Sequence, residues 1–170
     1  MKRCCLFLPS IILLATSCVN PDSTDSKNYQ LIVIDTFHTG GGGYNDTFLT
    51  LVDALGTTLA TDDNGNPDQA DHLGFSRITY TGGLASGTYY IKLNNPTGNG
   101  DGYYVIRVLT TDPGSTFPTV AKVDETTDTD DAVDGNGIPL NPVSITLGQV
   151  ISRRLDPVAT DVDWFKLVLP

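Results

Sequence analysis

From residue 29 onward, short runs of β-branched and aromatic residues replace any stretch of sustained helical periodicity. Clusters of Gly, Pro, Asn and Asp separate these runs, and such residues end strands and form turns. Short strands joined by turns are what an all-β sandwich is built from, so we expect a jelly-roll-like antiparallel β-sandwich of about eight strands. The expected strands are residues 29–37, 46–54, 57–61, 75–81, 87–93, 103–109, 144–153 and 162–169.

The N-terminus predicts export. Two basic residues precede an apolar run that ends at Ala15, and small residues then lead to Cys18. This is the layout of a secretory signal, which is too short to span a membrane. The ending LLATSC resembles a bacterial lipobox, although Ala15 stands where the pattern has Leu. We expect residues 1–17 to be removed and Cys18 to carry the lipid; the alternative is an ordinary signal peptide with an incidental cysteine.

Residues 18–28 are polar and predict a flexible tether between the lipid and the folded part. No cysteine follows Cys18, so a disulfide framework is impossible and stability must come from an apolar core, with or without ions. The expected location is the bacterial cell envelope. Val19 rather than Asp after Cys18 is compatible with sorting to an outer membrane and display at the cell surface.

The charge balance excludes some partners. The sequence has 10 basic and 20 acidic residues, and signal removal takes away Lys2 and Arg3, which leaves 8 minus 20, a formal charge of −12. Such a surface repels phosphate backbones and anionic lipid heads, so we expect no nucleic-acid partner and membrane attachment only through the lipid anchor. Cationic partners and Ca²⁺ stay open.

The series DTFLTLVDALGTTLATDDNG, SRITYT, GTYYIKLNN and GDGYYVIRV, together with SITLGQVISRRLDPVATDVDWFKLVLP, is similar to the bacterial pre-peptidase C-terminal (PPC) domain family. The resemblance covers residues 29–109 and 144–170. Members are small jelly-roll-like β-sandwiches appended to secreted hydrolases and surface proteins. The resemblance therefore implies a sandwich over residues 29–170, with 29–109 as its main part.

The order of these segments differs from the family, in which the segment like residues 144–170 comes first. Either the chain is a circularly permuted single sandwich that residues 143–170 complete, or it is a truncated tandem array. An unpaired strand at 162–169 would expose aromatic side chains and a free edge, which favours the first alternative. That alternative places the strand beside residues 29–37. It also predicts one shared core of Leu31, Leu49, Leu51, Ile91, Ile106, Phe165, Leu167 and Leu169.

Two acidic segments are candidate Ca²⁺ sites, because carboxylates and carbonyls suit a hard cation. Neither matches an EF-hand. The alternatives are metal-free Asx turns for the first segment and a solvated loop or linker at 110–142 for the second. The candidate ligands are Asp62, Asp63, Asn64, Asp68 and Asp71 in the first, and Asp128, Asp130, Asp131 and Asp134 in the second. Some members of the family bind Ca²⁺ near the corresponding loop or near the leading linker.

Catalytic motifs are missing from the sequence. His38 and His72 have no HExxH spacing, and there is no GxSxG elbow. The tyrosines at strand positions predict cross-strand packing, with a ligand patch on an outward face as the alternative; they are Tyr80, Tyr89, Tyr90, Tyr103 and Tyr104. No catalytic residue is therefore assigned.

These observations favour a non-catalytic, lipid-anchored envelope protein that binds a protein or polysaccharide ligand at the cell surface. The ligand-binding role rests on the family resemblance, because a fold does not fix a function. Two alternatives stay open: an accessory or remnant domain of a secreted hydrolase, and a structural envelope lipoprotein without a ligand.

Overall fold

The structure, a computed structural model, describes residues 27–38, 45–66, 74–113, 118, 120–121 and 131–170. These residues form strands and no helix, so none of their segments is a helix that could cross a membrane. The strands are β1 (Asn28–Tyr29), β2 (Ile32–Phe37), β3 (Phe48–Asp53), β4 (Thr58–Asp63), β5 (Arg77–Tyr80), β6 (Leu84–Ala85), β7 (Gly87–Asn94), β8 (Tyr103–Leu109), β9 (Val143–Ile145), β10 (Val150–Arg154) and β11 (Val162–Leu169).

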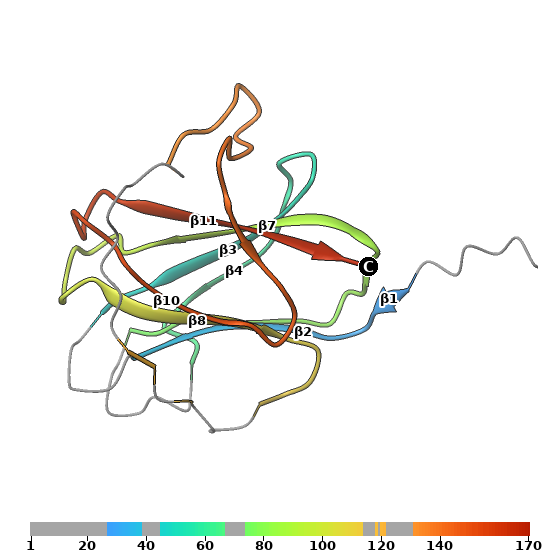
Figure 1. The fold of residues 1–170 in the computed structure, drawn as a ribbon, viewed down its shortest axis with the longest axis horizontal. Helices are drawn as coiled ribbons and strands as arrows, with labels where there is room; N and C mark the ends of the chain where they lie inside the picture. The colour runs from blue at the N-terminus through green and yellow to red at the C-terminus, as the bar shows by residue number, and fades with distance from the viewer. Residues whose placement is uncertain (1–26, 39–44, 67–73, 114–117, 119, 122–130) are drawn as a thin grey trace, which may run out of the picture.

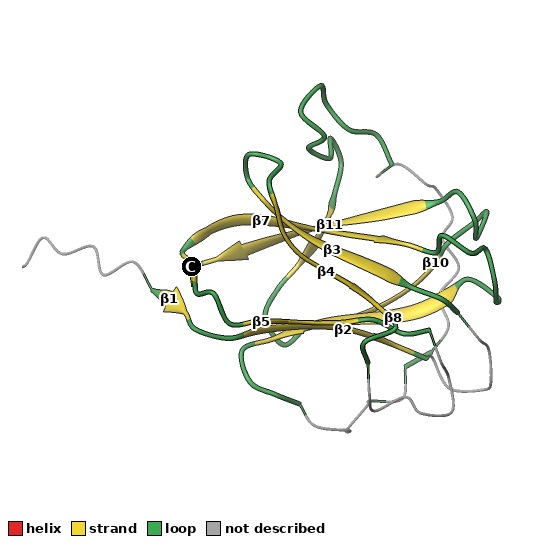
Figure 2. Cartoon of the chain, turned by 180° about the vertical axis from the view of Figure 1, so that it is seen from behind, coloured by secondary structure: helices red, strands yellow, loops and turns green. Residues whose placement is uncertain are grey.

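The strands form two facing layers, as Figures 1 and 2 show. One sheet has the order β10-β8-β2-β5, the other has the order β4-β3-β7-β11-β9, and β1 pairs with β6 beside them. The expectation of an all-β sandwich is confirmed. Eleven strands are present in the described residues rather than about eight, since β1, β6 and β9 are pieces of two or three residues. All pairs are antiparallel except β9 with β11.

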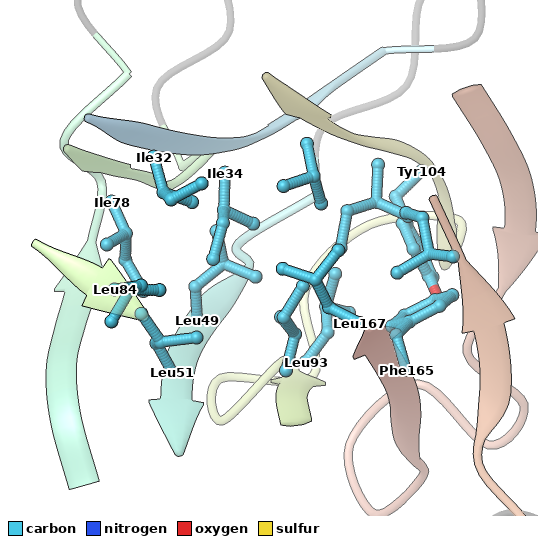
Figure 3. Packing of buried hydrophobic residues seen from close by; sticks show 14 of the residues in the cluster. Ile32, Ile34, Leu49, Leu51, Ile78, Leu84, Leu93, Tyr104, Phe165 and Leu167 are labelled. Atoms are coloured by element: carbon cyan, nitrogen blue, oxygen red, sulfur yellow. The ribbon is translucent and has the colours of Figure 1, made fainter. Parts of the chain in front are cut away.

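Alternation along the strands produces the core between the sheets (Figure 3). In β3, Leu49 and Leu51 are fully buried and point inward, because successive side chains of a strand face opposite sides. Ile91 and Leu93 of β7 do the same. Burying each such side chain contributes about 1.5 to 3 kcal/mol. No cysteine lies among the described residues, so this apolar core, with no disulfide there, stabilises the folded state.

Strand β11 completes the five-stranded sheet. Phe165, Leu167 and Leu169 enter the common core, which confirms the sequence prediction for these three residues. The predicted neighbour was wrong: β11 pairs antiparallel with β7 over its whole length, in the sheet opposite β2. Alternation specifies the face that a strand buries and leaves its partner unspecified.

Two further differences concern β2 and the segment before β11. Leu31 is only half-buried, and Ile32 and Ile34 take the core positions predicted from it, since an uninterrupted apolar run has no alternation to set its phase. The single expected strand at 144–153 is two strands, β9 and β10, which belong to different sheets. The turn between them needs Gly148, whose φ is 81°.

Every residue of β2 is buried, so both faces of this strand are covered. On the face away from the core, Asp35 accepts hydrogen bonds from Arg107 Nε at 2.7 Å and Nη2 at 2.9 Å. Arg77 Nη2 adds a third at 3.1 Å. A buried carboxylate is tolerated only when it is paired and hydrogen-bonded, and these two guanidinium groups supply both.

The two ends of the described fold lie together. Tyr29 Oη donates a hydrogen bond to the Pro170 carbonyl oxygen at 3.2 Å, and Ser86 Oγ donates to the same oxygen at 2.8 Å. Figures 1 and 2 show the C-terminus next to β1. The start of β1 and the end of β11 are therefore at the same end of the sandwich.

Candidate binding groove

The outer face of the five-stranded sheet carries an open cavity of about 660 Å³. This volume is in the range of small-molecule sites, about 300 to 1,000 Å³. The cavity lies over β3, β4, β7 and β11, on the side away from the core. Its lining residues, which we call the groove, are Thr50, Val52, Gly56, Thr58, Thr61, Lys92, Asp131, Val133, Asn136, Gly137, Thr160, Val162 and Trp164.

A row of four outward-facing residues crosses the floor of the groove from strand to strand. Thr61 of β4 pairs opposite Thr50 of β3, and Thr50 pairs opposite Lys92 of β7. Lys92 in turn pairs opposite Trp164 of β11. Directly opposed residues have Cβ atoms about 4.5 to 5.5 Å apart, so the row is contiguous. The strand register alone thus brings together four residues that span more than a hundred positions of the sequence.

The segment of residues 131–140 forms one wall of the groove. It folds back on itself, because Leu140 N–H donates to the Ala132 carbonyl at 2.8 Å and Asp134 N–H donates to the Ile138 carbonyl at 2.8 Å. The Asp134 carboxylate accepts the backbone N–H groups of Ile138 and Asn136 at 2.9 and 2.8 Å, and these bonds lower its pKa. Asp134 thus stabilises a turn. In Figure 1 this orange segment rises above β7 and β11.

Contacts at two points hold this wall over the sheet. Asp131 Oδ1 accepts the Val162 backbone N–H at 3.0 Å, which fixes the wall to the start of β11. At the other point, the tip of the β3–β4 hairpin meets the wall: a Cβ at Gly56 would lie 2.7 Å from the Asn136 carbonyl oxygen, and Gly56 has a φ of 85°. Gly56 is therefore required by both space and conformation.

The hairpin tip is itself ordered by a carboxylate. Asp53 Oδ1 accepts the backbone N–H groups of Thr57 and Leu55, each at 2.8 Å. The hydrogen bond from Thr57 is the main cause of the lowered pKa of Asp53. The groove is consequently bounded by two turns, each fixed by hydrogen bonds to one aspartate, so its shape exists before any ligand binds.

Charge and hydrogen-bonding capacity are concentrated on the floor. Lys92 Nζ lies 5.9 Å from the centroid of the Trp164 ring, a cation–π distance, and no described carboxylate forms an ion pair with it. Trp164 is 6% exposed, so most of its side chain is covered in the folded protein. The hydroxyl groups of Thr50 and Thr61 form no hydrogen bond with any other described residue.

The first acidic segment is only partly described. Asp62 Oδ2 accepts the backbone N–H groups of Gly65 and Arg77, each at 2.8 Å, so it holds the turn after β4 and joins it to the start of β5. Asp63 has a raised pKa, first because of burial and then because of the charges of Asp46 and Asp62. Asn64 donates from its side chain to Asp63 Oδ1 at 3.1 Å.

The remaining predicted ligands are divided between described and undescribed parts of the chain. Asp68, Asp71, Asp128 and Asp130 lie outside the described residues. Asp131 and Asp134 accept backbone hydrogen bonds that hold the groove wall, and they are far from Asp62 in the sequence. Among the described residues, no group of three acidic, His or Cys side chains is arranged to hold a metal ion. Calcium binding stays a prediction.

Other residues singled out from the sequence are distributed over the fold. His38 packs edge-on against Phe75, with ring centroids 6.3 Å apart, while His72 and Cys18 lie outside the described residues. Tyr104 is fully buried and donates a hydrogen bond to Asp163, which also pairs with Arg153. Tyr80, Tyr89, Tyr90 and Tyr103 are partly buried strand residues and are not among the groove residues.

Comparison with known proteins adds no relative: the chain matches no family model, no curated protein and no solved structure. The similarity to the PPC family thus stays a resemblance carried by sequence motifs. The groove was not predicted from the sequence. Its only sequence signal is a set of polar or aromatic residues at outward positions of strands, such as Thr50, Lys92 and Trp164, and their proximity depends on the register.

Proposed function

We propose that this protein is a non-catalytic, lipid-anchored protein of the bacterial envelope that presents a PPC-like β-sandwich as a binding module at the cell surface. The preformed groove on the outer face of the five-stranded sheet is the observation that carries this proposal. Concave sites with a few convergent polar groups are the usual places of ligand binding. The groove residues include no Ser, Cys or His, the usual nucleophiles and general base, which favours binding over catalysis.

The anchor assigns the location. Cys18 follows the lipobox-like LLATSC, and the polar residues that follow give the sandwich reach from the membrane. The strongly acidic composition makes electrostatic adsorption to anionic lipids unfavourable, so attachment depends on the acyl chains. Adhesion to a protein or polysaccharide is the role that suits a ligand site displayed in this way.

The test compares the wild type with the Cys18→Ala variant in the native host. The wild type should partition into the detergent phase and be degraded when intact cells are treated with protease. Cys18→Ala should be released as a soluble species. A conservative control is a substitution within the tether, Ser23→Ala, which should partition like the wild type. Equal partitioning of Cys18→Ala and the wild type would contradict the anchor.

A further inference from the structure

The groove has a chemistry that selects one class of ligand, and this inference rests on the proposed binding function. We propose that it binds a neutral oligosaccharide, with the sugar hydroxyls hydrogen-bonded to the row Thr61, Thr50 and Lys92. Threonine hydroxyls both donate and accept, as sugar hydroxyls do, so the two can pair in either direction. The lysine ammonium adds up to three donors.

The hydroxyl groups of the groove are available for a ligand. Those of Thr50, Thr58, Thr61 and Thr160 have no hydrogen-bond partner within the described part of the chain. They come from β3, β4 and the turn before β11, so they approach the cavity from its floor and from its rim. A ligand that carries hydroxyls along its whole length is the kind that could engage such a dispersed set.

Protein ligands fit the groove less well. An extended peptide binds a sheet by adding a strand to an exposed edge. The floor strands β3 and β7 are paired on both sides, so their backbone groups are already used. Strand β4 is the edge of the sheet, and its free backbone groups point sideways in the plane of the sheet, not up into the cavity over its face. Apart from the backbone at Gly56 and Gly137, the cavity is lined by side chains, and four of these are threonines. Recognition by side-chain hydroxyls is therefore the available mode.

The charge of the protein favours neutral over acidic oligosaccharides as ligands. Lys92 is the cation on the groove floor, but Asp131 lies in the adjoining wall and the whole chain carries a formal charge of −10. This field opposes the approach of a polyanion. A neutral chain meets no such barrier, and the ammonium of Lys92 can donate to its hydroxyl and ring oxygens while remaining over Trp164.

The fixed shape of the groove makes such weak contacts effective. The wall is fixed by Asp131 to Val162, and the hairpin tip by Asp53, before the ligand arrives. A preformed site avoids much of the ordering cost of binding.

Trp164 provides a spectroscopic signal for ligand binding in the groove. It is the single tryptophan of the sequence, and because Lys92 lies over its ring, we expect a ligand that engages Lys92 to change the emission.

The experiment titrates the full-length protein, extracted in a detergent without a sugar head group. The neutral probes are cello-, malto-, manno- and N-acetylchito-oligosaccharides, and oligogalacturonate is the acidic probe. Tryptophan emission is the readout. At least one neutral oligosaccharide should give a saturable change at micromolar to millimolar concentration. No saturable change with any of the neutral probes, or binding of oligogalacturonate alone, would overturn the proposal.

Isosteric variants locate the site. Thr50→Val and Thr61→Val remove a hydroxyl and keep a β-branched side chain, and each should weaken binding by about five- to tenfold, the effect of one lost hydrogen bond. Lys92→Met should weaken it at least as much. The matched control is Thr79→Val, an exposed β5 residue in the other sheet, which should bind like the wild type. Equal affinities for Thr50→Val, Thr61→Val and Thr79→Val would place the sugar elsewhere and overturn the assignment.

Failure of this inference can be told apart from failure of the proposed function. Cells that display the lipidated protein and attach to protein-coated surfaces, while its groove ignores every sugar, would refute the saccharide and leave the surface module intact. Sugar binding by a protein that does not partition with lipids would support the saccharide site and refute the lipid anchor.

Discussion

The contribution of β11 to stability can be measured with a single substitution. Leu167 is fully buried in the core and pairs opposite Tyr89 and Ile145 of the neighbouring strands. Leu167→Ala removes three carbon atoms, and at about 0.8 kcal/mol per buried methylene the transfer part alone is about 2.4 kcal/mol. Strands on both sides of β11 limit collapse around the cavity, so we expect a total loss of about 3 to 4 kcal/mol.

The assay is urea unfolding at equilibrium, followed by the Trp164 emission. The midpoint should fall while the slope with urea concentration stays constant, because the substitution changes stability and not the surface exposed on unfolding. Val168→Ala on the same strand is the matched control: Val168 is 54% exposed, and the expected change is within about 0.5 kcal/mol. If Leu167→Ala cost no more than Val168→Ala, the packing of β11 in the core would be refuted.

Deletion of the whole strand is the stronger perturbation. Removal of residues 161–170 takes Phe165, Leu167 and Leu169 out of the core and exposes the edge of β7. Their combined burial is worth about 5 to 9 kcal/mol, a large share of the 5 to 15 kcal/mol that stabilises a typical domain. The shortened protein should unfold or aggregate. Thermal melting like that of the full chain would show that the core does not need this strand.

Three further predictions concern charged residues. Asp35→Asn should lower the free energy of unfolding by about 3 kcal/mol, because Arg77 and Arg107 lose their buried carboxylate. Simultaneous replacement of Asp35, Arg77 and Arg107 by Leu and Met should recover much of this lost stability. A loss below about 1 kcal/mol for Asp35→Asn in urea titration would argue against the cluster. The pKa of Asp53 is lowered from its ordinary value of 3.8, so the carboxylate stabilises the hairpin tip fully above pH 3.8, and this stabilisation is lost as the pH falls through the lower pKa of the folded state. The amide NMR shifts of Leu55 and Thr57 should therefore change only below pH 3.8. A titration midpoint above pH 3.8 would contradict this prediction. Millimolar Ca²⁺ should raise the melting temperature and EGTA should lower it if the acidic segments bind the ion, whereas identical curves would leave Asp62 and Asp134 as turn residues.

The strands were predictable where alternation and turn residues agreed. Residues 103–109 and 162–169 are strands over the predicted spans, and the burial of Phe165 and Leu167 follows from their positions. Leu31 was misplaced because the apolar run around it has no alternation. The split of 144–153 into β9 and β10 was missed because a four-residue turn around Gly148 looks like part of one strand.

The groove lay beyond sequence analysis for a different reason. Thr50, Lys92 and Trp164 become neighbours only through two antiparallel registers, and a shift of one residue in either would turn the partner side chain to the core. The wall depends on Asp131, which looks like one more carboxylate in an acidic run until its bond to Val162 is seen. Both acidic segments could be located from the sequence, and turns were an alternative for the first, whereas the turn held by Asp134 in the second was not predicted.

The position of the groove determines how the proposed anchored protein would carry mechanical force. The proposed tether precedes β1, which leads into β2 in the four-stranded sheet (Figure 2). The groove lies on the outer face of the other sheet. A pull between the membrane and a bound ligand must therefore cross from sheet to sheet through the packed core. Strand β2 has partners on both sides, β5 and β8, so tension along it loads many backbone hydrogen bonds at once and opposes peeling one by one. If the proposed ligand binds in the groove, this arrangement would resist detachment under flow.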